Sequence, residues 1–195
     1  GCGVIGAHHA TAALKSNLVE LVAVADPMPQ RVADVQRQHP GAKGYATGQE
    51  LLADGEVQAV VLALPAQART ELALQSFAAG KHVLTEKPVA CHGDEVQRMI
   101  AARGALVAGC CSGRPQFLPS NILVRQFLAS GALGDLRIVR ARGVFSVGPK
   151  PAQTPPAWRL KRAINGGGIF ANWGCYDLDF LLSSLNWSLR PQSVW

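Results

Sequence analysis

The chain has 195 residues, 48% of them hydrophobic and 16% charged, which is the composition of a globular protein with room for one full domain and part of a second. No apolar run reaches the ~18 residues that a membrane span needs, so we expect no membrane partner. The net charge of +6 comes from scattered basic residues. Scattered charge indicates a solvated face or one suited to an anionic ligand, and we expect no nucleic-acid partner.

The chain contains five cysteines, an odd number, and no Cys-x-x-Cys pair. This pattern argues against a disulfide framework and against a zinc site, so we expect no metal. Free thiols fit a reducing compartment, and the cytoplasm is the predicted location. The sequence opens inside a motif without a start methionine, so an export signal ahead of it stays open.

Strands and helices are predicted to alternate along the first half of the chain. Apolar runs predict buried parallel strands, and helical spacing or Ala/Leu-rich stretches ending at a glycine predict the helices between them. This alternation with short connections predicts an α/β fold, a Rossmann-type doubly wound parallel sheet. The predicted strands are 18–25, 43–46, 57–64, 82–85 and 105–108, and the helices are 10–14, 30–39, 50–53, 69–79 and 94–103.

A strand should precede the glycine turn that opens the chain, but nothing precedes Gly1. In a doubly wound sheet that strand lies centrally, and its loss would badly destabilise the fold. We therefore expect the sequence to be a piece of a longer protein, truncated at both ends.

The pattern changes after about residue 115. We expect a dinucleotide-binding domain over 1–115 and the incomplete start of a second α/β domain over 116–195. The elements predicted for the second domain are a helix at 121–129, a turn at 131–134, a strand at 136–145, a Pro-rich loop at 149–156, a helix from the glycine cluster at 166–168 to residue 185, and a strand starting near 195.

The opening Gly-x-Gly-x-x-Gly motif is the first candidate site. Its glycines permit a tight turn, and the backbone N–H groups of the turn and of the following helix can approach a pyrophosphate. The spacing alone is weak, because the chain has 20 glycines. The residues expected at the pyrophosphate are Gly1, Gly3, Val4, Ile5 and Gly6.

Asp26 strengthens this interpretation, because it ends the next predicted strand twenty positions after Gly6. A carboxylate there would bind the ribose hydroxyls of the adenosine and repel a 2′-phosphate, which favours NAD over NADP. Arg31 lies close behind and keeps NADP possible. The alternative is that Asp26 is a turn residue before Pro27.

The segment Thr85-Glu86-Lys87-Pro88 follows a predicted parallel strand. Ligands bind at the carboxyl edge of open α/β sheets, so this segment is a second candidate site. From the residues alone, Lys87-Pro88 could be just a strand terminator.

Three segments, in this order, resemble the glucose–fructose oxidoreductase/inositol dehydrogenase (Gfo/Idh/MocA) family: Gly1-Cys-Gly-Val-Ile-Gly-Ala-His-His9, Ala79-Gly-Lys-His-Val-Leu-Thr-Glu-Lys-Pro88 and Gly166-Gly-Gly168. The resemblance covers essentially the whole chain, and the second segment is its specific part. It implies a Rossmann domain followed by an α/β domain with a large open sheet, through which we expect a homo-oligomer. It also implies NAD or NADP and a small carbohydrate-like substrate.

The resemblance assigns roles residue by residue. Lys87 matches the family's catalytic lysine, whose ammonium would hydrogen-bond the reacting oxygen, and the Lys87–Pro88 peptide is expected to be cis. Glu86, in the same motif, and Lys87 are also expected to contact the cofactor, and the loop at Leu64 and Pro65 would cover it. Trp158 and Arg159 resemble a pair that reaches the cofactor in some members.

The chain departs from the family at two places. Asn172 stands where Asp is usual and Tyr176 where His is usual, four residues apart and so on one helical face. Asn172 can position a hydroxyl but cannot act as a base. Tyr176 is the candidate acid/base if a nearby cation lowers its pKa, or else a buried structural residue. The second departure is Leu64-Pro65-Ala66-Gln67-Ala68-Arg69, where Thr-Pro-Asn-x-x-His is common.

These features predict an NAD(P)-dependent dehydrogenase or reductase acting on CH–OH groups of a sugar, cyclitol or related substrate. Tyr176 would be the acid/base, Lys87 would orient the reacting oxygen, and Asn172 would position a hydroxyl. Two alternatives stay open, an NAD-dependent glycoside hydrolase on the same scaffold and a non-catalytic NAD- and sugar-sensing regulator.

Overall fold

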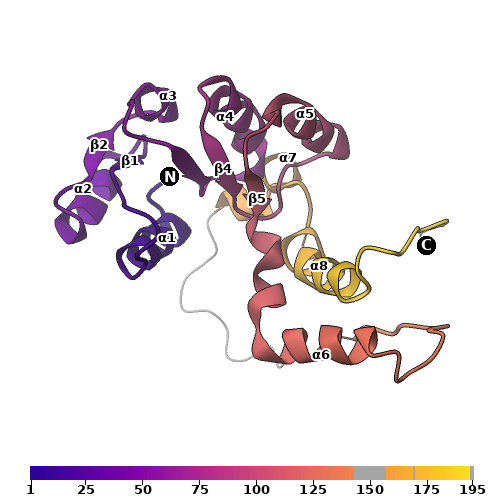
Figure 1. Cartoon of the computed structure of the whole chain (residues 1–195). Helices are drawn as coiled ribbons and strands as arrows, with labels where there is room; N and C mark the ends of the chain where they lie inside the picture. The colour runs from indigo at the N-terminus through magenta and orange to yellow at the C-terminus, as the bar shows by residue number, and fades with distance from the viewer. Residues whose placement is uncertain (143–156, 169, 194–195) are drawn as a thin grey trace.

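The computed structural model describes residues 1–142, 157–168 and 170–193, and Figure 1 shows the course of the chain. Helices and strands alternate as far as Cys110, and helical segments follow. The strands are β1 (Ala23–Ala25), β2 (Lys43–Tyr45), β3 (Ala59–Leu62), β4 (His82–Thr85) and β5 (Ala108–Cys110). The helices among them are α1 (Val4–Leu14), α2 (Pro29–Gln38), α3 (Gly48–Leu52), α4 (Ala66–Ala78) and α5 (Gly93–Arg103).

All strand pairings are parallel, which confirms the doubly wound α/β class. β1 pairs with β2, and β3, β4 and β5 form a second sheet in that order. A cavity of about 950 Å³ lies between the two sheets, lined by residues of β1 and β3 and by the glycine turn.

Two strands are shorter than predicted, and both border this cavity. The apolar run 18–25 forms a strand only over Ala23–Ala25, and 57–64 only over Ala59–Leu62. A strand extends only as far as its neighbour offers hydrogen bonds, and each of these strands is paired on one edge. Leu18 and Val19 are correspondingly exposed.

The fifth strand lies at Ala108–Cys110, and not at 105–108 as predicted. Its place is set by the register with β4, in which Val83 pairs with Ala108 and Thr85 with Cys110. Residues 104–106 form the turn after α5, where the Leu106 N–H bonds the Arg103 carbonyl, and the Val107 carbonyl then accepts from the Val83 N–H of β4.

Two apolar clusters hold these elements together. The larger one packs β3 and β4 against α3, α4 and α5, with Phe77 and Ala73 of α4 and Met99 of α5 among its buried members. The smaller one packs α1 and α2 against β1, through Ala10 and Val32 among others. Figure 1 shows α3, α4 and α5 along one side of the strands and α1 on the other.

The second part of the described chain is helical. It comprises the 3₁₀ helix η1 (Cys111–Phe117), α6 (Pro119–Ala129), the 3₁₀ helix η2 (Ala157–Leu160), α7 (Arg162–Asn165), the π-helical turn η3 (Phe170–Gly174) and α8 (Cys175–Ser184). The helices predicted at 121–129 and after the glycine cluster are thereby confirmed, and Gly131 and Gly134 take positive φ in the predicted turn.

A strand was predicted at 136–145. The structure describes residues 136–142 of this segment, and they form neither strand nor helix. No strand of the described ranges lies beside it to supply the ladder that a strand requires. The remainder of that strand, the Pro-rich loop at 149–156 and the strand start at Trp195 lie outside the described residues. Within the described parts, no helix has both the length and the apolar character needed to cross a membrane.

Candidate functional site

The glycine turn is as tight as predicted, and it packs closely against the sheet. α1 begins at Val4 with Gly3 as N-cap. A Cβ on Gly1 would lie 2.6 Å from the Ala63 carbonyl oxygen at the end of β3, and one on Gly6 would collide with the Gly1 carbonyl. Only glycine at both positions lets the turn, the helix and the sheet approach this closely.

The start of α1 is an open anion-binding surface. The first backbone N–H groups of a helix have no partner inside it, and here they belong to Val4, Ile5 and Gly6. Val4 is 75% exposed and Ile5 47% exposed, so the first turn faces solvent. These donors and the helix dipole suit a pyrophosphate, and a dinucleotide fits the cradle that the glycines leave open.

Asp26 follows β1 and holds the glycine turn. It is 5% exposed, and its two carboxylate oxygens accept hydrogen bonds from the backbone N–H groups of Cys2 and Met28, each at 2.9 Å. The Arg31 guanidinium lies 3.8 Å from the same carboxylate. The structure therefore gives Asp26 a structural role at the turn, and ribose binding stays a prediction.

Replacing Asp26 tests that structural role. We expect Asp26→Ala to lower the free energy of unfolding by ~2 kcal/mol, because the buried Cys2 N–H and the partly buried Met28 N–H lose a charged acceptor. Chemical denaturation measures the change. The control is Asp34→Ala on the exposed face of α2, for which we expect less than ~0.5 kcal/mol. Equal effects of the two variants would contradict the role of Asp26.

Lys87 follows β4 at the carboxyl edge of the sheet. The Lys87–Pro88 peptide is cis, as predicted. The Lys87 ammonium donates to both the side-chain Oδ1 and the backbone carbonyl of Asn172, each at 2.8 Å. Asn172 lies in η3, and π-helical turns are frequent at functional sites. The structure thus joins two sequence-predicted residues that are 85 positions apart.

Tyr176 and Trp173 complete the surroundings of Lys87. The Lys87 Nζ lies 5.0 Å from the centre of the Tyr176 ring and 5.7 Å from that of Trp173. Burial lowers the pKa of Lys87 and outweighs the opposing charges of Cys175 and Glu86, and the nearby Arg114 and Arg159 lower it further. A lysine of lowered pKa beside two aromatic rings is typical of a functional site.

Arg114, in η1, contacts the phenol of Tyr176 and was missed in the sequence analysis. Its guanidinium donates to the Tyr176 Oη and lies 5.1 Å from the ring centre. Burial raises the pKa of Tyr176, and Arg114 opposes that rise. A nearby cation was expected to lower the pKa of Tyr176; Arg114 is that cation, but the net shift of the pKa is upward. The only sequence signal for Arg114 is its place just after a strand at the same sheet edge.

Asp179 fixes α8 against η1. Its carboxylate accepts from the Ser112 hydroxyl at 3.0 Å and from the Gln116 side-chain amide. These bonds link the helix that carries Tyr176 to the segment that carries Arg114. The partly buried contacts of Asp179 therefore help to fix the position of Tyr176 relative to Arg114.

Arg69 is a second residue that sequence reasoning missed. It is 5% exposed, on α4, and its Nε donates to the Leu64 carbonyl at 2.7 Å. Its Nη1 donates to the Glu86 carbonyl at 2.7 Å and to the Pro88 carbonyl. Arg69 thus holds the backbone on both sides of Lys87. Arg69 lies in the segment 64–69, which differs from the family's usual sequence. No sequence pattern indicates that its side chain points into the protein.

The remaining predicted cofactor residues surround the same edge. Pro65 is the N-cap of α4, and Leu64 is half-buried against the larger apolar cluster. Arg159, in η2, lies close enough to Lys87 for its charge to lower the lysine pKa. Trp158 is 38% exposed beside it. The structure gathers these residues at one edge, and their contacts with a cofactor stay predictions.

Glu86 is buried beside the lysine and faces α1. Its carboxylate accepts from the Lys87 backbone N–H at 3.1 Å and lies 3.1 Å from the His9 Nε2. Burial alone raises the pKa of Glu86, but the bonds from His9 and Lys87 outweigh it and hold the pKa at about 2. Glu86 is therefore ionised at neutral pH.

The glycine cradle at the start of α1 and the lysine beside Tyr176 define a dinucleotide-binding Rossmann protein with a polar site at the carboxyl edge of its sheet. Residues 1–105 match the family described as an oxidoreductase family with an NAD-binding Rossmann fold. Residues 122–194 match the C-terminal domain described for the same GFO/IDH/MocA group. The chain belongs to the Gfo/Idh/MocA oxidoreductase family, and its first domain is an NAD-binding Rossmann domain.

Named relatives share this family. Trans-1,2-dihydrobenzene-1,2-diol dehydrogenase of Bos taurus is 32% identical over 178 residues, which are 90% of this chain and 50% of that protein. The 1,5-anhydro-D-fructose reductase of Ensifer adhaerens is 29% identical over 192 residues, 95% of this chain and 55% of that protein. An oxidoreductase domain protein from Kribbella flavida is similar in structure, with a TM-score of 0.83 and 26% identity over 95% of this chain and 51% of that one. The chain spans about half the length of these relatives.

Proposed function

We propose that this protein is an NAD(P)-dependent dehydrogenase or reductase that transfers hydride between nicotinamide and a secondary alcohol carbon of a carbohydrate-like substrate. The observation that carries the proposal is the Lys87 ammonium, held by Asn172 beside the Tyr176 phenol at the edge where the Rossmann sheet ends. Two relatives named for reactions of a cyclic diol and of a sugar derivative support the substrate class.

Each residue has a role in this proposal. NAD supplies the hydride acceptor when it is bound. The glycine turn and the start of α1 hold its pyrophosphate, and the Asp26 carboxylate next to that turn favours NAD over NADP. Lys87 donates a hydrogen bond to the reacting oxygen, and Asn172 orients that ammonium and positions a substrate hydroxyl. Tyr176 moves the proton, with Arg114 at its oxygen.

The pH dependence follows from the raised pKa of Tyr176. The phenol is protonated at neutral pH, so it can give a proton during carbonyl reduction but must ionise to take one during alcohol oxidation. We expect the oxidation rate to rise with pH through the neutral and alkaline range, and the reduction rate to stay level and fall only near the phenol pKa. Steady-state rates in both directions measure this.

Two variants test whether Tyr176 and Arg114 cause this pH dependence of the rates. We expect Tyr176→Phe to lose ~10²–10⁴-fold in kcat together with the alkaline rise. We expect Arg114→Met to move the rise to higher pH, because the cation that opposes the upward shift is gone. An unchanged pH profile in Tyr176→Phe would exclude the tyrosine as the acid/base.

The activity itself is tested by mixing the protein with NAD and a panel of sugars, cyclitols and cyclic diols while following nicotinamide reduction. We expect net reduction with one substrate class. Release of free sugar without net reduction would instead indicate transient oxidation during glycoside cleavage. NAD binding without turnover of any panel member would indicate a sensor.

The organisation of the protein is also part of the proposal. We infer a Rossmann domain over 1–115 and the beginning of a substrate domain at 116–195, whose sheet would form the homo-oligomer interface. All five cysteines are free thiols, which supports a reducing compartment such as the cytoplasm.

A further inference from the structure

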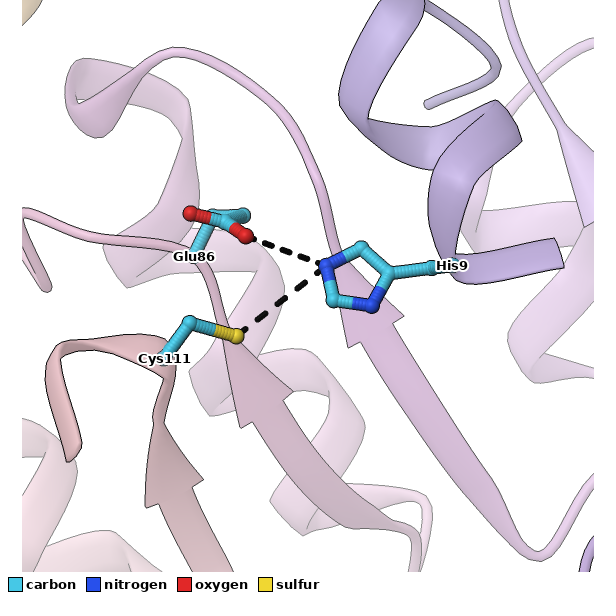
Figure 2. Close-up of side chains that lie close together, drawn as sticks. All are labelled: His9, Glu86 and Cys111. Atoms are coloured by element: carbon cyan, nitrogen blue, oxygen red, sulfur yellow. Dashed lines mark hydrogen bonds and ion pairs between the residues drawn. The ribbon is translucent and has the colours of Figure 1, made fainter. Parts of the chain in front are cut away.

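Three side chains with metal-binding atoms converge beside Lys87 (Figure 2). His9 comes from α1, Glu86 follows β4, and Cys111 opens η1 directly after β5. All three side chains point toward one another across the carboxyl edge of the sheet. Residues from positions 9, 86 and 111 have no spacing motif, so the cysteine pattern of the sequence could not indicate such a cluster.

The distances within the cluster suit one tetrahedral ion. The His9 Nε2 lies 3.1 Å from the Glu86 Oε1 and 4.0 Å from the Cys111 Sγ, and all three atoms lie within 4.8 Å of one another. Zinc bonds of about 2.1 Å to nitrogen and oxygen and about 2.3 Å to sulfur place tetrahedral ligands about 3.4 Å (N to O) and about 3.6 Å (N to S) apart. Each of the two observed distances needs to change by only a few tenths of an ångström.

We propose that His9, Glu86 and Cys111 form a binding site for Zn²⁺ with its fourth position open. Glu86 is 6% exposed and Cys111 5%, and the His9 side chain is 25% exposed, so entry is from the histidine side. One sulfur, one nitrogen and one oxygen ligand match zinc better than the oxygen-seeking Mg²⁺ or Ca²⁺.

A partner outside the cluster already orients one of the three ligands. The Lys87 backbone N–H bonds the Glu86 Oε2 at 3.1 Å, which leaves the Oε1 directed at His9. Such outer partners fix the ligands of metal sites in proteins. The ion would link α1, which packs with α2 and β1, to the sheet edge formed by β4 and β5. The site does not depend on the proposed hydride transfer.

Zinc binding must displace the proton of the Cys111 thiol. The charged and titratable groups that face this thiol include Glu86, His9, Cys110, Arg114 and Arg69. Burial and the Glu86 carboxylate raise the pKa of Cys111 to about 12, so the thiol is neutral at pH 7.

The test uses Co²⁺ as a spectroscopic probe and Zn²⁺ competition to measure affinity. We expect the protein to bind one Co²⁺ with a thiolate-to-cobalt charge-transfer band and intense visible bands of tetrahedral cobalt, both abolished by Zn²⁺. We expect Cys111→Ala to lose the charge-transfer band and to weaken zinc binding by at least ~100-fold, the upper end of the loss seen for outer-shell partners.

Two further variants serve as the control and the substitute for Cys111→Ala. Cys110→Ala removes the neighbouring thiol, whose sulfur accepts from the Ser112 N–H, and should leave the cobalt spectrum unchanged. If Cys111→Ala does not fold, Glu86→Gln, which keeps the shape of the side chain, should also weaken zinc binding. A cobalt spectrum without a thiolate band, or equal zinc affinity in wild type and Glu86→Gln, would overturn the proposal.

Discussion

Lys87→Met should retain NAD binding but lose ~10²–10⁴-fold in turnover. The reason is geometric, because the ammonium that would donate to the reacting oxygen is held at the sheet edge by two bonds to Asn172, each of 2.8 Å. The pyrophosphate cradle at the start of α1 is built from backbone groups and does not involve this side chain. NAD titration measures the cofactor affinity of this variant, and steady-state kinetics measures its turnover.

Lys81→Met is the matched control. Lys81 lies just before β4, at the opposite end of the strand that Lys87 follows, and its ammonium bonds the Asp54 carbonyl at 3.2 Å. We expect turnover near wild type for this variant. Full turnover in Lys87→Met, or a loss of the same size in both variants, would remove Lys87 from the proposed site.

Arg69→Met should have the second-largest effect, lowering both stability and turnover. Its guanidinium donates to the carbonyls of Leu64, Glu86 and Pro88, and without it these groups lose their donors inside the protein. We expect the free energy of unfolding to fall by ~3 kcal/mol, since each buried group left without a partner costs about 1–3 kcal/mol. Chemical denaturation measures this loss.

The same variant should lower kcat by ~10-fold or more while NAD affinity changes little, because a small misplacement of a positioned group is costly to catalysis. Arg69→Lys should restore only part of the rate, since an ammonium lacks the planar fork that reaches several carbonyls. Arg98→Met on α5 is the control, because Arg98 is paired with Glu71 at the surface. Normal kcat in a destabilised but folded Arg69→Met would mean that Arg69 stabilises the fold without positioning Lys87.

The sequence predicted the fold well where local pattern and neighbouring strands agree. β4 was placed correctly at His82–Thr85 because it is paired on both edges, so its apolar run and its ladder coincide. β1 was predicted too long because the apolar run 18–25 is only partly matched by a neighbouring strand. β5 was displaced because its ends depend on register with β4, which no local pattern encodes.

In the candidate site, too, the sequence predicts the residues with a local pattern and misses those that depend on tertiary structure. The glycine turn, Lys87, Asn172 and Tyr176 were found because residue type, spacing and family resemblance coincide there. Arg69 and Arg114 were missed because an arginine in sequence is usually solvent-exposed, and only the fold shows which carbonyl or phenol it reaches. The cluster of His9, Glu86 and Cys111 was likewise invisible, since tertiary structure alone brings these residues together.

Hydride transfer between a substrate carbon and nicotinamide is the activity that we propose for this protein. The most direct measurement uses a substrate from the activity panel that carries deuterium at the carbinol carbon, followed by mass spectrometry of the reduced nicotinamide. We expect one deuterium on the nicotinamide ring and a slowed rate when chemistry limits turnover. A reduced nicotinamide without deuterium, or consumption of substrate with no label transfer, would contradict the account.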